Sequence, residues 1–331
     1  MEHGHILGRG ARVFGSVVCA ALALGTLVWI GRDLTVAAEF SDLWWSWSGA
    51  PARTEDGIWA TSLYDPALIA VYIVAGTTAL RSPSAAGSLA SAAIATILLR
   101  APGLWTLNAD WLQGVDQDLR NRALLSSGAA VTLATVLLIA VAAGRRPADT
   151  SGSAYGVVTS DERPPGRPTP AAATTAGVFL AGATVILAAW EVRYAVRDGW
   201  DAYWHKVTGE RTMYALLQPP DACGKWTVAL MCAVVVCCAM ARAPLTRTLG
   251  MTASALVLVW GAAETTRNLK ERVFENFDTL TTEEQLHVST GLFLLLAGFA
   301  ALWALAGRGE SDPTSEPLRG WQEPSAPPPS W

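Results

Sequence analysis

Eight long apolar segments dominate the sequence and determine what it can fold into. They lie at about residues 12–31, 66–80, 85–106, 123–143, 172–192, 226–241, 248–266 and 287–306. A helix that crosses a bilayer needs about 20 mainly apolar residues. It also bonds all of its backbone polar groups internally, as the bilayer interior requires. We therefore expect an all-α integral membrane protein with eight transmembrane helices.

Composition agrees with this expectation. The chain has 331 residues, of which 51% are hydrophobic and only 16% charged, whereas soluble domains carry about 25% charged residues. The formal net charge of −4 gives no sign of a nucleic-acid partner, since such proteins neutralise phosphates with basic residues. The sequence thus favours membrane lipid as the surroundings of the chain.

The first apolar segment has two interpretations. It follows Arg9 and Arg12, and small residues after it resemble a cleavage site, as in a signal peptide. However, its apolar stretch from Val13 to Ile30 exceeds the usual signal-peptide core of about 7–15 residues. We interpret it as a retained helix.

An internal repeat supports that choice. Short motifs recur in the same order at offsets of 161 to 163 residues: WIGR (29–32) with WEVR (190–193), RSP (81–83) with RAP (242–244), and SSG (126–128) with STG (289–291). Each half then contains four spans. Because four is even, the halves should have parallel topology around an axis along the membrane normal. The fold class we expect is a tandem duplication of a four-helix unit.

The repeat defines the domain organisation. Residues 1–143 form the first four-helix repeat and residues 172–307 the second. Between them, residues 144–171 are rich in Pro, Ser, Thr and Gly and predict a flexible cytoplasmic linker. Residues 308–331, which are rich in Pro, predict a disordered tail.

Charge in the short turns suggests an orientation. Arg81, Arg242 and Arg247 lie in very short turns without acidic residues, and basic residues favour the cytoplasmic side. We expect a multi-pass protein of the plasma (cytoplasmic) membrane with both termini in the cytoplasm.

Ionisable residues are rare near the middle of the spans and gather toward their outer ends. The repeat register places Arg100 opposite position 263, beside Glu264, which suggests an ion pair between the repeats. The alternative, that each side chain extends separately to the lipid headgroups, is favoured, since long charged side chains near helix ends commonly do this.

Motifs for catalysis or cofactor binding are missing. The four histidines show no spacing typical of a haem or metal site, and the sequence contains no phosphate-binding loop, no nucleophile elbow and no C-x-x-C motif. We expect no cofactor, no metal and no catalytic residues. An enzyme that acts on lipid-linked substrates remains a weaker alternative.

Tryptophans are concentrated on one side. Of the 15 in the chain, eleven lie at or beyond the expected outer helix ends: Trp29, Trp44, Trp45, Trp47, Trp59, Trp105, Trp111, Trp190, Trp200, Trp204 and Trp226. An ordinary aromatic belt occupies both membrane interfaces, so this distribution is unusual.

Each repeat also predicts a short amphipathic helix after its first span. In the first, Phe40, Leu43, Trp44 and Trp47 have the spacing of one helix face. In the second, the same positions are occupied by Trp200, Tyr203, Trp204 and Val207, at an offset of 160. Such a helix either lies flat in the outer interface or folds over the bundle as a lid. Sugar stacking ranks below interfacial contact, which needs no ligand.

Two functions follow from this architecture. The one we favour is a non-enzymatic membrane protein with an extracytoplasmic aromatic and acidic platform for lipid, for cell-wall material or for a protein partner. The alternative is a transporter of an apolar or amphipathic small molecule with its site between the two halves, since parallel repeats are common among transporters.

Overall fold

The computed structural model describes residues 5–55, 57–112, 114–147, 167–210 and 213–307. Within these ranges the chain is almost entirely helical. The helices are α1 (Arg9–Val36), α2 (Phe40–Ser48), α3 (Tyr64–Arg81), α4 (Ala85–Thr106), α5 (Gln117–Ala143), α6 (Pro170–Arg197), α7 (Trp200–Thr208), α8 (Asp221–Met240), α9 (Leu245–Lys270) and α10 (Thr282–Ala306). Every expected apolar segment coincides with one of the eight long helices.

Seven of these helices, α1, α4, α5, α6, α8, α9 and α10, are long and apolar enough to cross a membrane. The chain is therefore a multi-pass membrane protein by composition and helix length. Helix α3 has 18 residues but lies outside this set. Its ends carry Asp65 and Arg81, which make it less apolar than the others.

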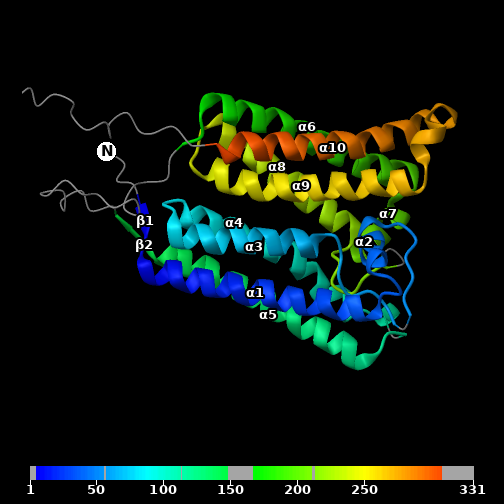
Figure 1. The fold of residues 1–331 in the computed structure, drawn as a ribbon, viewed down its shortest axis with the longest axis horizontal. Helices are drawn as coiled ribbons and strands as arrows, with labels where there is room; N and C mark the ends of the chain where they lie inside the picture. Colours follow the sequence, from blue (N-terminus) through cyan, green and yellow to red (C-terminus); the bar gives the residue numbers. More distant parts are fainter. Residues whose placement is uncertain (1–4, 56, 113, 148–166, 211–212, 308–331) are drawn as a thin grey trace, which may run out of the picture.

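The long helices form two bundles (Figure 1). Helices α1, α3, α4 and α5 pack together, as do α6, α8, α9 and α10, and α4 and α9 meet between the bundles. Helices α4 and α9 are also the two most buried of the seven candidate spans. Small side chains in both helices, such as those of AAGSLASAA (85–93) and TASAL (252–256), allow this close packing.

One end of the molecule carries a small sheet (Figure 1). Strands β1 (His5–Leu7) and β2 (Arg145–Pro147) are antiparallel, with Ile6 opposite Arg146. The expected linker, residues 144–171, therefore has a strand near its start and ends inside α6. Its residues 148–166 lie outside the described ranges, and so do residues 308–331 of the expected tail. We call the end of the molecule that carries this sheet the β1/β2 end.

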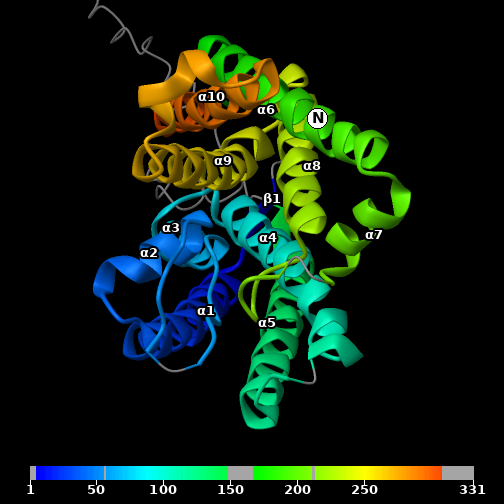
Figure 2. The ribbon, with the colours of Figure 1, turned by 90° about the vertical axis from the view of Figure 1, so that its right-hand side faces the viewer.

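The two short helices, α2 and α7, lie at the opposite end, here called the α2/α7 end (Figures 1 and 2). Each has nine residues and ends at a glycine in the left-handed conformation, Gly49 (φ 74°) and Gly209 (φ 87°). Only glycine adopts this conformation without a steric cost. Both helices and their terminal glycines are 160 positions apart, the offset that the apolar pattern predicts.

Candidate functional site at the α2/α7 end

The predicted apolar faces of α2 and α7 are only partly buried. Leu43 and Tyr203, which occupy equivalent positions, are 4% and 6% exposed. Phe40, Trp200 and Trp204 remain 82%, 65% and 51% exposed. The other three predicted positions, Trp44, Trp47 and Val207, are half-buried. A lid would bury its whole apolar face against the bundle, so this pattern favours helices that lie in the membrane interface.

Helix α2 is held in place by side chains of neighbouring elements. The Trp47 indole donates a hydrogen bond to Thr61 Oγ1 (3.0 Å). The Lys270 ammonium lies over the Trp45 ring, 4.2 Å from its centroid, and donates to the carbonyl of Pro51 (2.9 Å). Trp45, which lies off the predicted apolar face, therefore joins α2 to the end of α9 by a cation–π contact.

Helix α7 is attached to α8 by polar contacts, of which the shortest is a hydrogen bond between two aromatic side chains. The Trp226 indole donates to the Tyr203 hydroxyl (2.7 Å). Burial raises the pKa of Tyr203, so the phenol keeps its proton at physiological pH while its oxygen accepts from the indole. The equivalent residue of α2 is Leu43, which has no polar group, so α2 is held instead through Trp45 and Trp47.

A buried carboxylate organises the loop after α2. Asp33 is fully buried and accepts hydrogen bonds from the backbone of Ala60 (3.1 Å) and from both the backbone and hydroxyl of Thr61 (2.6 Å each). Arg32 lies 2.8 Å from the same carboxylate. A buried charge needs such partners because it has lost its hydration. Asp33 therefore has a structural role.

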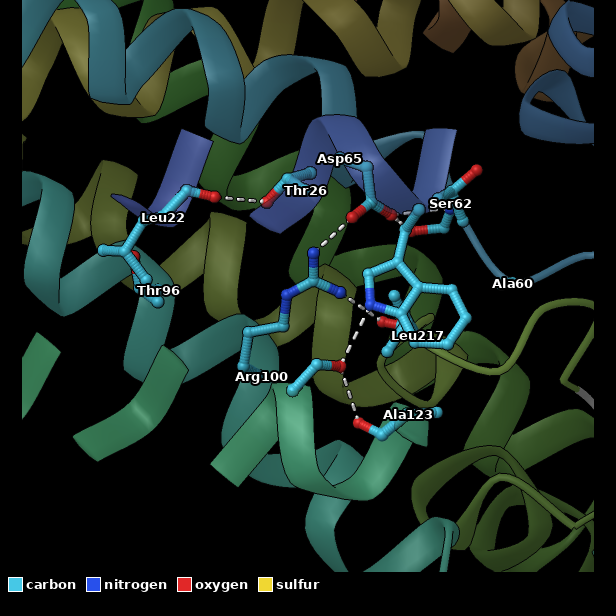
Figure 3. Close-up of polar contacts among 12 residues, drawn as sticks. Leu22, Thr26, Ala60, Ser62, Asp65, Thr96, Arg100, Ala123 and Leu217 are labelled. Carbon is cyan, nitrogen blue, oxygen red and sulfur yellow. Dashed lines mark hydrogen bonds and ion pairs between the residues drawn. The ribbon is translucent and has the colours of Figure 1, made fainter. Parts of the chain in front are cut away.

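Arg100 does not pair with Glu264, as the suggested ion pair between the repeats requires, and at 6% exposure it does not extend to the headgroups, as the favoured alternative requires. Its guanidinium bonds Asp65, which is fully buried, and donates to the backbone carbonyl of Leu217 at 3.0 Å (Figure 3). Glu264 instead lies 2.6 Å from Arg267 and 3.7 Å from His287. The reason is that α3 begins before the predicted segment, which places Asp65 in its first turn, facing α4.

The loops at this end join the two bundles. The backbone amides of Leu216 and Leu217 donate to the carbonyls of Trp59 and Ala60, at 3.2 and 2.8 Å. Arg100 adds its bond to Leu217. The loop after α7 consequently lies between α2 and α7 when the molecule is viewed from this end (Figure 2). This arrangement fixes the surface of the α2/α7 end.

A second cluster of ionisable groups lies within the second bundle. Lys225 lies 2.8 Å from Asp221 and 3.3 Å from Glu191. Glu191 is 1% exposed, and neither of its carboxylate oxygens accepts a hydrogen bond within the described residues. Beside it, Lys225, Glu264 and His287 line a small cavity of about 40 Å³ together with aromatic side chains. A cavity of this size holds water rather than an organic ligand.

All three lysines of the chain lie against aromatic rings at this end. Lys206 is 3.7 Å from the centroid of Tyr194, Lys225 is 5.3 Å from the same ring, and Lys270 lies over Trp45. The scarcity of lysine beside abundant arginine was the one available signal for this cluster. Sequence reasoning missed it because the partners lie on separate helices.

The described part of the chain contains no group of three or more histidine, cysteine, aspartate and glutamate side chains placed to hold a metal ion. Its polar clusters at the α2/α7 end are ion pairs and hydrogen bonds that fix loops and short helices. Several aromatic side chains are exposed at this end.

Comparison with known proteins adds no family: no family model, curated protein or solved structure matches this chain.

Proposed function

We propose that this protein is a non-enzymatic plasma-membrane protein whose α2/α7 end faces out of the cell and forms a binding platform. The observation that supports it best is the exposure of aromatic side chains on a fixed surface. We define the platform by Phe40, Trp200, Trp204 and Tyr214, which are 82%, 65%, 51% and 76% exposed. Aromatic side chains supply large contact areas at interfaces.

The rigidity of this surface supports a binding role. Tyr214 belongs to the loop whose Leu216 and Leu217 pair with Trp59 and Ala60. The described part of this loop from residue 213 onward is thus held in place before any partner arrives, so that binding there costs less conformational entropy.

The platform has two parts. Trp200 and Trp204 lie on α7 at the side of the molecule (Figure 2), and Phe40 lies on α2. Aromatic side chains in these positions suit the lipid headgroup region. Tyr214 lies on the loop that crosses between the two bundles, and we propose that it faces a protein or cell-wall partner. The short helices would then set the depth of the molecule in the membrane, and the central loop would contact the protein or cell-wall partner.

The internal repeat is consistent with this proposal. Helices α1 and α6 begin and end 161 positions apart. Between the bundles, a Cβ added at Gly87 would lie 2.6 Å from the Thr248 hydroxyl, and the Thr252 hydroxyl bonds Ser91 at 3.3 Å. Both pairs are 161 positions apart, so equivalent residues meet. This is what a pseudo-twofold axis between duplicated units predicts, and we propose eight spans with α3 as the eighth.

Photo-crosslinking in intact cells tests the platform. A benzophenone amino acid placed at Tyr214 should give a discrete macromolecular adduct, and one placed at Trp204 should give lipid adducts. Trp303 is the matched control, because it is 75% exposed at the far end of α10. The proposal is wrong if positions 214 and 303 give the same lipid adducts, since Tyr214 would then face only the bilayer.

A groove between the bundles favours the alternative, a transporter. It has a volume of about 410 Å³ and is lined by α3, α4 and α9. Ser91, which lines it, is only 1% exposed. A cysteine at position 91, in a variant without the native cysteines, separates the two functions. Labelling by impermeant thiol reagents from both sides of the membrane would favour alternating access, and labelling from one side or neither would favour the platform.

A further inference from the structure

The groove between the bundles opens near the β1/β2 end. Its lining is apolar along one part of its length and polar along the other. Its wall includes Ala70 and Val74 of α3 and Met251 and Ala255 of α9, which are apolar. Toward the β1/β2 end the lining becomes polar, with two arginines and several hydroxyl groups. A volume of about 410 Å³ falls in the range of small-ligand sites.

Two positive charges lie at the polar end. Arg81 ends α3 and is exposed, without an ion pair or hydrogen bond to any residue that the structure describes. Arg247 is held against the end of α10 by hydrogen bonds from Nε to the Leu305 carbonyl (3.1 Å) and from Nη2 to the Ala306 carbonyl (3.3 Å). None of the described residues that line the groove is acidic. The polar end therefore attracts anions.

Backbone dipoles add to this charge. Helices α4 and α9 both begin at this end, and neither N-cap residue, Ser84 nor Pro244, makes a side-chain capping bond. Helix N-termini carry partial positive charge and free amide donors. The hydroxyls of Ser82 and Ser84 bond each other at 2.8 Å, which leaves one hydroxyl proton of the pair as a further donor. Phosphate oxygens are suitable acceptors for these arginine, amide and hydroxyl donors.

The apolar part of the groove distinguishes a lipid from free phosphate. Ala70 and Arg81 are 11 positions apart on α3, which at about 1.5 Å per residue corresponds to about 16 Å. This is close to half of the hydrocarbon thickness, about 30 Å, of a bilayer. The groove thus has the length of one leaflet, with its charged end at headgroup depth.

We propose that this groove binds one anionic phospholipid, with its phosphate between Arg81 and Arg247 and an acyl chain along Ala70, Met251 and Ala255. Basic pockets between membrane helices commonly hold such headgroups. The site lies at the end opposite the platform, and the proposal does not rest on the platform's function. The bound lipid would contact both bundles.

Native mass spectrometry of the purified full chain tests the site, with phosphatidylglycerol or phosphatidylcholine added at equal concentrations. We expect one phosphatidylglycerol to bind in preference. Arg81→Gln should weaken its binding about fivefold, the value of one basic contact at a membrane surface, and should weaken phosphatidylcholine less, because the choline ammonium already offsets the charge of its phosphate. Ala255→Phe, which fills the apolar wall, should weaken both lipids.

Arg9→Gln is the matched control, because Arg9 is an exposed arginine in the first turn of α1, at the same end of the molecule but outside the groove. Equal losses for Arg9→Gln and Arg81→Gln would overturn the proposal, because binding would then follow net charge alone. Competition by glycerol phosphate at equal concentration would also overturn it, since the groove would then take a soluble phosphate. Unchanged binding in both Arg81→Gln and Ala255→Phe would place the lipid elsewhere.

Discussion

Arg100 is 6% exposed and joins three parts of the molecule: α4, the first turn of α3 through Asp65, and the loop after α7 through the Leu217 carbonyl. A buried ion pair of this kind stabilises little relative to a well-packed apolar pair, but the loss of one partner leaves an uncompensated charge. Its role at the residue scale is to fix the loop that presents Tyr214.

Asp65→Ala should therefore destabilise the protein by about 3–5 kcal/mol, which a thermal-shift assay in detergent measures. The double variant Asp65→Leu with Arg100→Met should be less destabilised than either single variant, because no charge is left buried. Glu283→Ala, which removes an exposed partner of Arg193 and Arg197, should leave the melting temperature unchanged. A double variant that is worse than both singles would contradict this account.

A second prediction at the residue scale concerns the contacts of Lys270 with α2 and the loop after it. Lys270→Ala removes both the contact with the Trp45 ring and the bond to Pro51. A cation–π contact at an exposed site contributes about 0.5–1 kcal/mol, so amide hydrogen exchange in α2 should become about two to five times faster. Arg272→Ala, a neighbouring exposed change, should leave α2 exchange as it is. Equal effects of both changes would mean that Lys270 does not hold α2.

At the scale of elements, α9 and α10 pack more closely than any other helix pair. A Cβ at Gly261 would lie 2.1 Å from the backbone nitrogen of Leu295, and one at Gly298 would lie 2.5 Å from that of Leu258. Glycines allow backbones to touch in membranes, where burial of apolar surface does not drive association. The geometry of the second bundle thus depends on these two positions.

Gly261→Ala should destabilise the protein by about 1–3 kcal/mol through overpacking, seen as a lower melting temperature and reduced yield. Gly31→Ala is its control, since a Cβ there meets no atom within 4 Å and alanine favours helix. Similar losses for both variants would show that the close approach of α9 and α10 is not what Gly261 provides.

Elements were predictable where the sequence has a strong period. Long apolar segments gave the eight long helices, and the apolar spacing before Gly49 and Gly209 gave α2 and α7. Side-chain partners were not predictable in the same way. Asp65 fell one residue outside its predicted segment, and the contacts of Lys225 come from different helices. Strand β1 is too short to show a period, and its partner lies 140 residues away.

At the scale of the whole molecule, the strands and the short helices define two opposite ends. With α3 as an eighth span, a cysteine at Ser41 in α2 and one at Arg146 in β2 should be labelled from opposite sides of the membrane by an impermeant thiol reagent. Ser41 should be the one labelled in intact cells. Labelling of both positions from the same side would contradict eight spans, and labelling of Arg146 alone in intact cells would reverse the orientation.

The positions of the three lysines make the unmodified chain its own topological probe. Lys206, Lys225 and Lys270 all lie at the α2/α7 end. A lysine-specific protease or an amine-reactive dye therefore reaches its side-chain targets from one face of the membrane, whichever face that is. Digestion of intact cells should cut after Lys270, the most exposed of the three, and digestion of inverted vesicles should leave the chain whole.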